Sequence, residues 1–454
     1  MALRRPDFCS VVAAAVLLTC ADPAWGLEPV FSDGFERRVT TGCDGETPPV
    51  PENLVLHSVF ANPDDYAVAT RGIWAVWWQP PFDHADDAEL ILDRLETVRC
   101  NAIFYLSMRD PPNPGLGFYY NVYVHHGIND AFPDEWGNGQ GRDIDGNPFL
   151  TLPAGYHLDQ ANLDHEGFHV FQFSTDSPGF EYSGDSAWYS ETSAQWYLST
   201  QAPGGLTTFV QIGTIEANPQ LALWQGWTNP APGDPTDWNY TVRQYGMHSL
   251  MHYLTTVSGV EDRIIAEGYY GGITQSPQAF LYQRIGPSNL RHHFANSAAA
   301  NTADFDYLAP EQVVRARQEI AVYGDPGTLH HYVAEHTTTG TNGALLRPPT
   351  QLEPRGWAYN VIRVNNPGIA DYFIEVLGDA QGSEGAASHF EARVVVITPG
   401  GAEYTPLDMI SPQEGSASVS VPAGASDLFL VVVTMPEHFN GHQTYGYEYR
   451  IEVK

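Results

Sequence analysis

One short stretch decides how the rest of the chain is interpreted: Asp164-His165-Glu166-Gly167-Phe168-His169-Val170. If this stretch is helical, His165 and His169 stand one turn apart on the same face, where both imidazoles can bind one cation. Zinc is the ion for which this spacing is typical, and Glu166 between the two histidines can accept a proton from a zinc-bound water. Gly167 counts against the helix, because glycine weakens a helix interior.

A zinc site that keeps one position open for water needs a third protein ligand. The expected ligand is Glu191, which follows His169 with 21 residues between them. Its neighbours are aromatic and small, so we expect its carboxylate on a helix in apolar surroundings, where it needs a partner such as a cation. Glu181 and Asp185 are alternatives, although their Ser, Gly and Pro neighbours predict a loop.

The order of these residues resembles that of the gluzincin zinc metallopeptidases, the thermolysin-like group. In that family a His-Glu-x-x-His motif is followed by a helical Glu-x-x-Ala, as Glu191 and Ala194 follow the motif here. The resemblance extends over the segment 85–260, and it implies zinc-dependent hydrolysis of peptide bonds with Glu166 as the catalytic base. It also implies an oxyanion donor from a later helix, for which Tyr245 is preferred and His248 is the alternative.

Hydrophobic periodicity predicts helices and strands around the motif. Before the motif we expect a helix over 87–98, a strand over 118–125 and a short strand over 149–152. The resemblance makes 149–152 the antiparallel edge strand, which would hold an extended peptide by main-chain hydrogen bonds. Further helices are expected over 160–173, 188–199, 242–257 and 311–323.

The sequence changes character after Pro348 and Pro349. Short β-rich segments separated by Gly, Pro and Asn turns predict a sandwich of the jelly-roll or immunoglobulin-like kind. The six segments are 358–364, 371–377, 390–398, 416–421, 427–434 and 445–453. The expected fold class is therefore α+β, with a zincin-like domain over 54–345 and an all-β sandwich over 351–454. This order also resembles a bacterial domain family of unknown function with the same zinc signature, and its sandwich could contact glycan, protein or only the neighbouring domain.

Residues 1–26 have the features of a signal peptide, and 27–53 those of a linker. The apolar run Val11–Leu18 is too short to span a bilayer, and no later run reaches the required length. We therefore expect a secreted or periplasmic protein without a transmembrane anchor. Cleavage of the signal peptide leaves Cys43 and Cys100, which can pair in an oxidising compartment or stay as two separate thiols.

The net charge of −33 argues against nucleic acid or anionic lipid as a partner. It is compatible with calcium, and Asp143-Ile144-Asp145-Gly146-Asn147 has the alternating acids and the glycine of a calcium loop. The later ligands of such a loop are missing, so a turn is the first interpretation and a calcium site the second.

Three functions compete on this evidence. The first is an exported zinc metallopeptidase that acts on a peptide or protein. The second is a non-catalytic surface or adhesion protein on a zincin scaffold, and the third is a zinc hydrolase that acts on a cell-wall or other non-protein substrate. The intact set of His165, Glu166, His169 and Glu191 favours an enzyme, because a decayed scaffold is expected to lose one of its members. His248 and His252 also stand one turn apart, but their neighbours predict a packing face rather than a metal site.

Overall fold

The computed structural model describes residues 50–55, 65–80, 82–111, 116–126, 139–142, 148–201, 211–226, 243–310, 312–314, 316, 318, 332–337 and 343–454. The chain forms two compact units, which divide after Ser174, inside the segment that was expected to be a single domain. The predicted signal peptide, Cys43 and the candidate calcium loop 143–147 lie outside the described residues.

The first unit contains a five-stranded sheet with the order β1-β2-β3-β5-β4. Its central strands β2 (Trp74–Trp78), β3 (Tyr120–His125) and β5 (Pro148–Pro153) run parallel to one another. All five residues of β2 are buried, as expected for a parallel strand that is covered on both faces. The outer strands β1 (Ala67–Arg71) and β4 (Gly139–Arg142) are antiparallel to their neighbours.

The prediction that 149–152 is the edge strand is wrong. The strand exists as β5, but it lies between β3 and β4, and β4 is the antiparallel edge strand on this side of the sheet. Sequence reasoning missed β4 because its sequence, Gly-Gln-Gly-Arg, has no alternation of apolar and polar residues.

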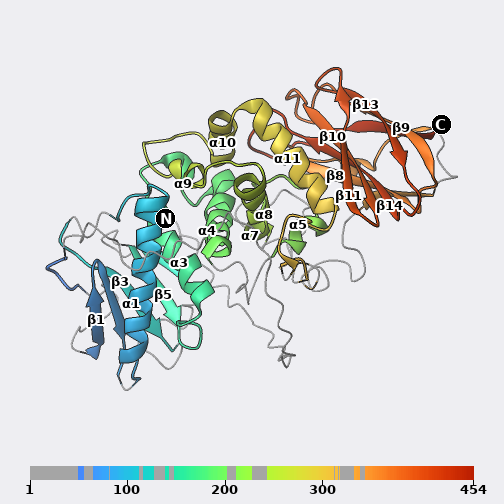
Figure 1. The fold of residues 1–454 in the computed structure, drawn as a ribbon. Helices are drawn as coiled ribbons and strands as arrows, with labels where there is room; N and C mark the ends of the chain where they lie inside the picture. Colours follow the sequence, from blue (N-terminus) through green and yellow to red (C-terminus); the bar gives the residue numbers. More distant parts are fainter. Residues whose placement is uncertain are drawn as a thin grey trace, which may run out of the picture. The chain divides into compact units, whose positions relative to one another are not determined.

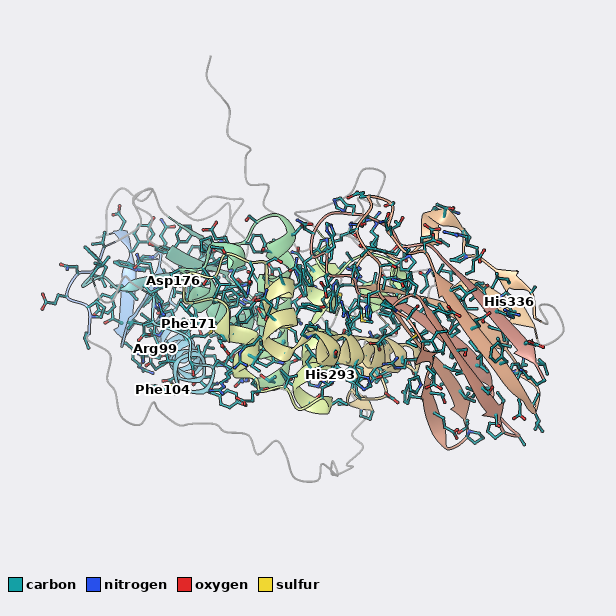
Figure 2. All side chains as sticks on the ribbon, turned by 90° about the horizontal axis from the view of Figure 1, so that it is seen from above. Arg99, Phe104, Phe171, Asp176, His293 and His336 are labelled. Atoms are coloured by element: carbon teal, nitrogen blue, oxygen red, sulfur yellow. The ribbon has the colours of Figure 1, made fainter. Side chains whose placement is uncertain are left out.

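Two helices of the first unit pack against each other, α1 (Ala85–Cys100) and α3 (Gln160–Gln172) (Figure 1). Both were predicted, because apolar residues recur at helical spacing. A π-helical turn, η2 (Asn101–Tyr105), follows α1, and Figure 2 shows Arg99 and the exposed Phe104 at this end of the helix. Cys100 is disulfide-bonded, and its partner lies outside the described residues.

The second unit begins with a helical segment. Its helices and turns are η4 (Pro178–Phe180), η5 (Gly184–Ser186), α4 (Ala187–Gln201), α5 (Gly213–Ala217), α7 (Arg243–Gly246), α8 (His248–His252), η6 (Tyr253–Val257), α9 (Arg263–Glu267), α10 (Pro277–Ile285) and α11 (Pro287–Thr302). The helix predicted over 242–257 is thus divided into three parts. A Cβ at Gly246 would lie 2.3 Å from the carbonyl oxygen of Gln211, so the backbone approaches another segment closely where the helix is interrupted. Of the helix predicted over 311–323, positions 312–314, 316 and 318 are described, and they are helical.

The rest of the second unit is a β-sandwich of two five-stranded sheets with the orders β11-β10-β14-β8-β6 and β12-β13-β9-β15-β7. The six predicted segments are present as β8 (Ala358–Asn365), β9 (Ala370–Gly378), β10 (Phe390–Thr398), β13 (Glu414–Val421), β14 (Asp427–Thr434) and β15 (Tyr447–Val453). The structure adds β6 (Tyr332–Thr337), β7 (Leu345–Leu346), β11 (Gly401–Pro406) and β12 (Asp408–Met409). Buried side chains from both sheets form one apolar core. His336 of β6, labelled in Figure 2, lies in one sheet, and its Nε2 is 2.8 Å from the hydroxyl of Tyr449 in the other.

The loop between β14 and β15 binds the helical segment of the same unit. Gln278 of α10 donates to the carbonyl of Phe439 at 2.7 Å, and Trp224 donates to the carbonyl of Gly441 at 2.8 Å. The amide of Gly441 donates to Asp185 of η5, just before α4, at 3.1 Å. These bonds join the sandwich to the helical segment. No helix among the described residues is long and apolar enough to cross a membrane.

Candidate metal centre

Helix α3 carries the His-Glu-x-x-His motif, as predicted. Its N-cap is Asp159, whose side chain accepts a hydrogen bond from the amide of Asn162 at 3.1 Å and so satisfies one of the free amides at the helix start. His165 and His169 lie one turn apart within this helix and are both buried, with 9% and 4% of their surfaces exposed.

The two imidazoles converge on one small volume. Nε2 of His165 lies 3.1 Å from Nε2 of His169, and the ring planes are nearly perpendicular at 88°. Two ring nitrogens that point at the same space are the arrangement that a shared cation requires.

A neighbouring amide orients the second imidazole. Oε1 of Gln172 lies 2.5 Å from Nδ1 of His169, and because this oxygen is an acceptor, the proton of the ring belongs on Nδ1. The lone pair is therefore on Nε2, which faces His165. The ring of Phe173 stacks on that of His169 at 5.3 Å between centroids and further restricts its rotation. Metal-binding histidines are commonly held in this way by a partner on their other nitrogen.

Glu191 lies on α4 and only 7% of its surface is exposed. One ligand atom each from His165, His169 and Glu191 lie within 4.8 Å of one another, so these three residues could hold a metal ion. The set contains two imidazole nitrogens and one carboxylate, a donor set that suits zinc.

An ion pair fixes α3 to α1 directly beside the motif. The guanidinium of Arg94 donates to both carboxylate oxygens of Asp164, with Nε 2.5 Å from Oδ1. Asp164 is completely buried, and burial raises the pKa of its carboxyl to about 6, although Arg94 opposes the shift. The pair fixes the rotation of α3 about its axis, and therefore the direction of His165, the next residue.

Gly167 has a packing role that its sequence context did not reveal. A Cβ at this position would lie 2.9 Å from Cδ2 of Leu95 and 3.5 Å from both methyl groups of Val98. The glycine allows α3 to approach α1 closely. The weak helix propensity that counted against the motif is therefore offset by packing.

The other predicted residues have separate places. Glu166 is partly buried on α3, and Tyr245 is partly buried on α7. Helix α7 packs on α4 next to Glu191, where the hydroxyl of Thr192 donates to the carbonyl of Gln244. Nδ1 of His248 donates to the carbonyl of Tyr245 at 3.0 Å. The catalytic roles of Glu166 and of Tyr245 or His248 stay predictions.

The alternative third ligands lie in other surroundings. Asp185 accepts the amide of Gly441, and burial raises the pKa of its carboxyl. Glu181 is exposed at the end of η4. Neither belongs to a group that could hold a metal among the described residues.

Sequence reasoning missed a second cluster of metal-binding side chains, made of His84, Asp87 and His157, whose ligand atoms also lie within 4.8 Å of one another. It was missed because His157 is 70 residues from Asp87 and contributes from a different segment. The one local signal is His84-Ala85-Asp86-Asp87 at the start of a predicted helix.

No protein-family model and no curated protein sequence matches the chain. Among solved structures, it is similar to the CBM22-1–GH10 modules of endo-1,4-beta-D-xylanase 10B from Clostridium thermocellum in complex with xylohexaose, at 14% identity and a TM-score of 0.16 over 20% of this chain and 19% of that chain. It is also similar to a family GH115 4-O-methyl-alpha-glucuronidase with specificity for decorated arabinogalactans, at 9% identity and a TM-score of 0.16 over 84% of this chain and 64% of that chain. The chain therefore spans less than two thirds of each of these structures, and TM-scores of 0.16 do not identify its fold.

Proposed function

We propose that this chain is an exported zinc-dependent metallopeptidase of the gluzincin type, with a zincin-like domain that contains the motif. One observation carries the proposal: His165, His169 and Glu191 present two imidazole nitrogens and a carboxylate within 4.8 Å of one another. The hydrogen bond from Nδ1 of His169 to Gln172 supports it, because it leaves Nε2 of this ring as the donor atom toward an ion.

Zinc at this position would lower the pKa of a coordinated water and polarise the carbonyl that is cleaved. The residues of the chain supply the other steps. Glu166, between the two histidines, accepts the proton of the attacking water and passes it to the leaving amine. Tyr245, or His248 from the neighbouring helix, donates a hydrogen bond to the oxyanion of the tetrahedral intermediate.

The antiparallel edge strand β4 offers a place for the substrate. An extended peptide can add to such an edge through main-chain hydrogen bonds, which hold it without selecting its side chains. β4 contacts α3, the helix with the motif. The substrate class proposed here is therefore an extended peptide or protein segment.

Export rests on separate observations. Residues 1–26 have the pattern of a signal peptide, and Cys100 is disulfide-bonded, as is usual in a secreted or periplasmic protein.

The test compares metal content and peptide hydrolysis in three variants of the full chain. A His165→Ala/His169→Ala variant should contain one zinc ion per chain less than the wild type and should not hydrolyse a broad peptide library. Glu166→Gln should keep the zinc content of the wild type and lose hydrolysis, because the amide cannot accept the proton. Glu181→Gln, at an exposed carboxylate outside the cluster, is the matched control and should keep both.

Equal zinc content in the wild type and the double histidine variant would overturn the metal site. If the double histidine variant contains one zinc ion less than the wild type, but the wild type does not cleave any peptide, the result would instead favour a non-protein substrate or a non-catalytic scaffold.

A further inference from the structure

The cluster of His84, Asp87 and His157 shares no residue with the first metal-binding group, and all three of its members belong to the first unit. His84 is the N-cap of α1, Asp87 is in the first turn of this helix, and His157 is in the loop between β5 and α3. A fourth residue, His126, follows β3 directly. β3 and β5 are parallel neighbours, with His125 paired to Pro153, so their carboxyl ends bring these residues to one edge of the sheet.

The four side chains form one connected network. Oδ2 of Asp87 lies 2.7 Å from Nδ1 of His84 and 2.9 Å from Nε2 of His157. Nε2 of His84 lies 2.7 Å from Nε2 of His126, whose ring stacks on Phe82 at 3.6 Å between centroids. Each of the two ligand histidines is 8% exposed, whereas the side chain of Asp87 is 28% exposed, so the carboxylate provides an opening to solvent.

We propose that His84 through Nδ1, Asp87 through Oδ2 and His157 through Nε2 form a second binding site for a divalent transition-metal ion. Two imidazoles and one carboxylate are a donor set for zinc, cobalt or nickel rather than for calcium or magnesium, which take oxygen ligands. His126 does not bind the ion in this assignment. When Nδ1 of His84 binds the ion it gives up its proton, and Nε2 then carries the one proton of the neutral ring and donates it to Nε2 of His126, which orients His84 for coordination.

The surrounding charges favour a cation. Asp87 Oδ2 lies within hydrogen-bond distance of a ring nitrogen of both His84 and His157, so a cation bound there would replace two hydrogen bonds to this carboxylate. Asp83 and Asp86 are exposed beside the cluster. The single lysine of the chain is its last residue, Lys454, outside this unit.

Metal binding requires two small adjustments. Zinc bonds near 2.1 Å in a tetrahedron place neighbouring donor atoms about 3.4 Å apart, so the present spacings of 2.7 and 2.9 Å must widen by about 0.7 and 0.5 Å. Nδ1 of His157 now accepts the amide of Gly155 at 3.1 Å, and this amide must turn away when Nε2 binds the ion. Gly155 has nothing within 4 Å of its Cβ position and a φ of +97°, so the turn has room for this change.

The experiment titrates the full chain with Co²⁺ and records the visible absorption of the bound ion. The His165→Ala/His169→Ala variant isolates the second site, because it lacks two proposed ligands of the first. In this background we expect one Co²⁺ per chain, and none after a further Asp87→Asn or His157→Gln substitution. Asp86→Asn, which removes the same charge from the same helical turn, is the matched control and should keep the ion.

His126→Leu in the same background should weaken Co²⁺ binding about 10- to 100-fold, as is usual when the partner of a metal-binding histidine is lost, because leucine cannot accept a hydrogen bond from His84. This variant retains all three donors, so it tests the site even if the ligand variants do not fold by circular dichroism. The proposal is overturned if the double histidine variant binds no Co²⁺, or if Asp87→Asn and His157→Gln bind it as Asp86→Asn does. This experiment measures Co²⁺ binding and not peptide hydrolysis. The proposal of a second site can therefore fail while the proposed peptidase function stands, and the peptidase function can fail while the second site stands.

Discussion

Replacing Arg94 by methionine tests whether the ion pair between α1 and α3 holds the motif helix in place. The side chain of Asp164 is completely buried, whereas that of Arg94 is 21% exposed. Removal of the guanidinium leaves a buried carboxylate without its counter-charge, which typically costs 3–5 kcal/mol. Because water reaches Arg94, we expect the lower end of this range, about 3 kcal/mol of unfolding free energy at pH 7.

Calorimetry and urea unfolding measure this loss. For a unit of this size, about 3 kcal/mol corresponds to a decrease of roughly 6–12 °C in Tm. The matched control is the double variant Arg94→Met/Asp164→Asn, which removes both charges and should recover more than half of the loss. A double-mutant cycle then gives the coupling between the two side chains. A single variant that unfolds within 1 °C of the wild type, or a double variant no more stable than the single one, would refute the reasoning.

Three further predictions follow from single positions. Gln172→Leu should weaken zinc binding by His169 about 10- to 100-fold, measured by competition with a chelator; unchanged affinity would contradict the orienting hydrogen bond. Gly167→Val should destabilise the chain by about 1–3 kcal/mol in urea unfolding, because its side chain meets Leu95; a neutral result would contradict the close helix packing. Burial lowers the pKa of His252 from 6.5 to about 4. The stability that comes from burying the neutral imidazole is therefore fully present above pH 6.5, and it is lost as the pH falls toward 4 and the unfolded chain binds a proton. Between pH 6.5 and pH 4 the free energy of unfolding of the wild type should therefore fall by about 3 kcal/mol more than that of His252→Gln. Parallel curves of unfolding free energy against pH for the two proteins would contradict the lowered pKa of His252.

Local patterns of apolar, small and turn-forming residues were sufficient to predict the main helices and strands. α1, α3 and α4 were predicted from apolar and small residues at helical spacing, and the six main sandwich strands were predicted from short β-rich runs between turns. The cluster of His165, His169 and Glu191 was also within reach, because the motif fixes two ligands on one helix and only the third had to be chosen from later acids.

Features that depend on contacts between distant segments could not be predicted. β4 has no apolar alternation, and it is defined only by its pairing with β5. The helix over 242–257 is interrupted where Gly246 closely approaches Gln211, a contact across 35 positions of sequence. The sequence alone indicates that Gly167 lowers the helix propensity of α3. The position of Leu95 on α1 shows that the absence of a side chain at Gly167 lets the two helices pack closely.

Both proposed metal sites depend on α1, although the helix contributes a ligand to only one of them. Asp87 binds the second ion directly, whereas Arg94 acts on the first site through Asp164. The two α1 residues are seven positions apart, which is about 10 Å along the helix and places them on the same face. A loss of Arg94 should therefore weaken metal binding at His165 and His169 through the rotation of α3, while it leaves the Asp87 site intact. Co²⁺ titration of Arg94→Met should show one weakened and one unchanged ion, and equal weakening of both would mean that the substitution displaces α1 itself.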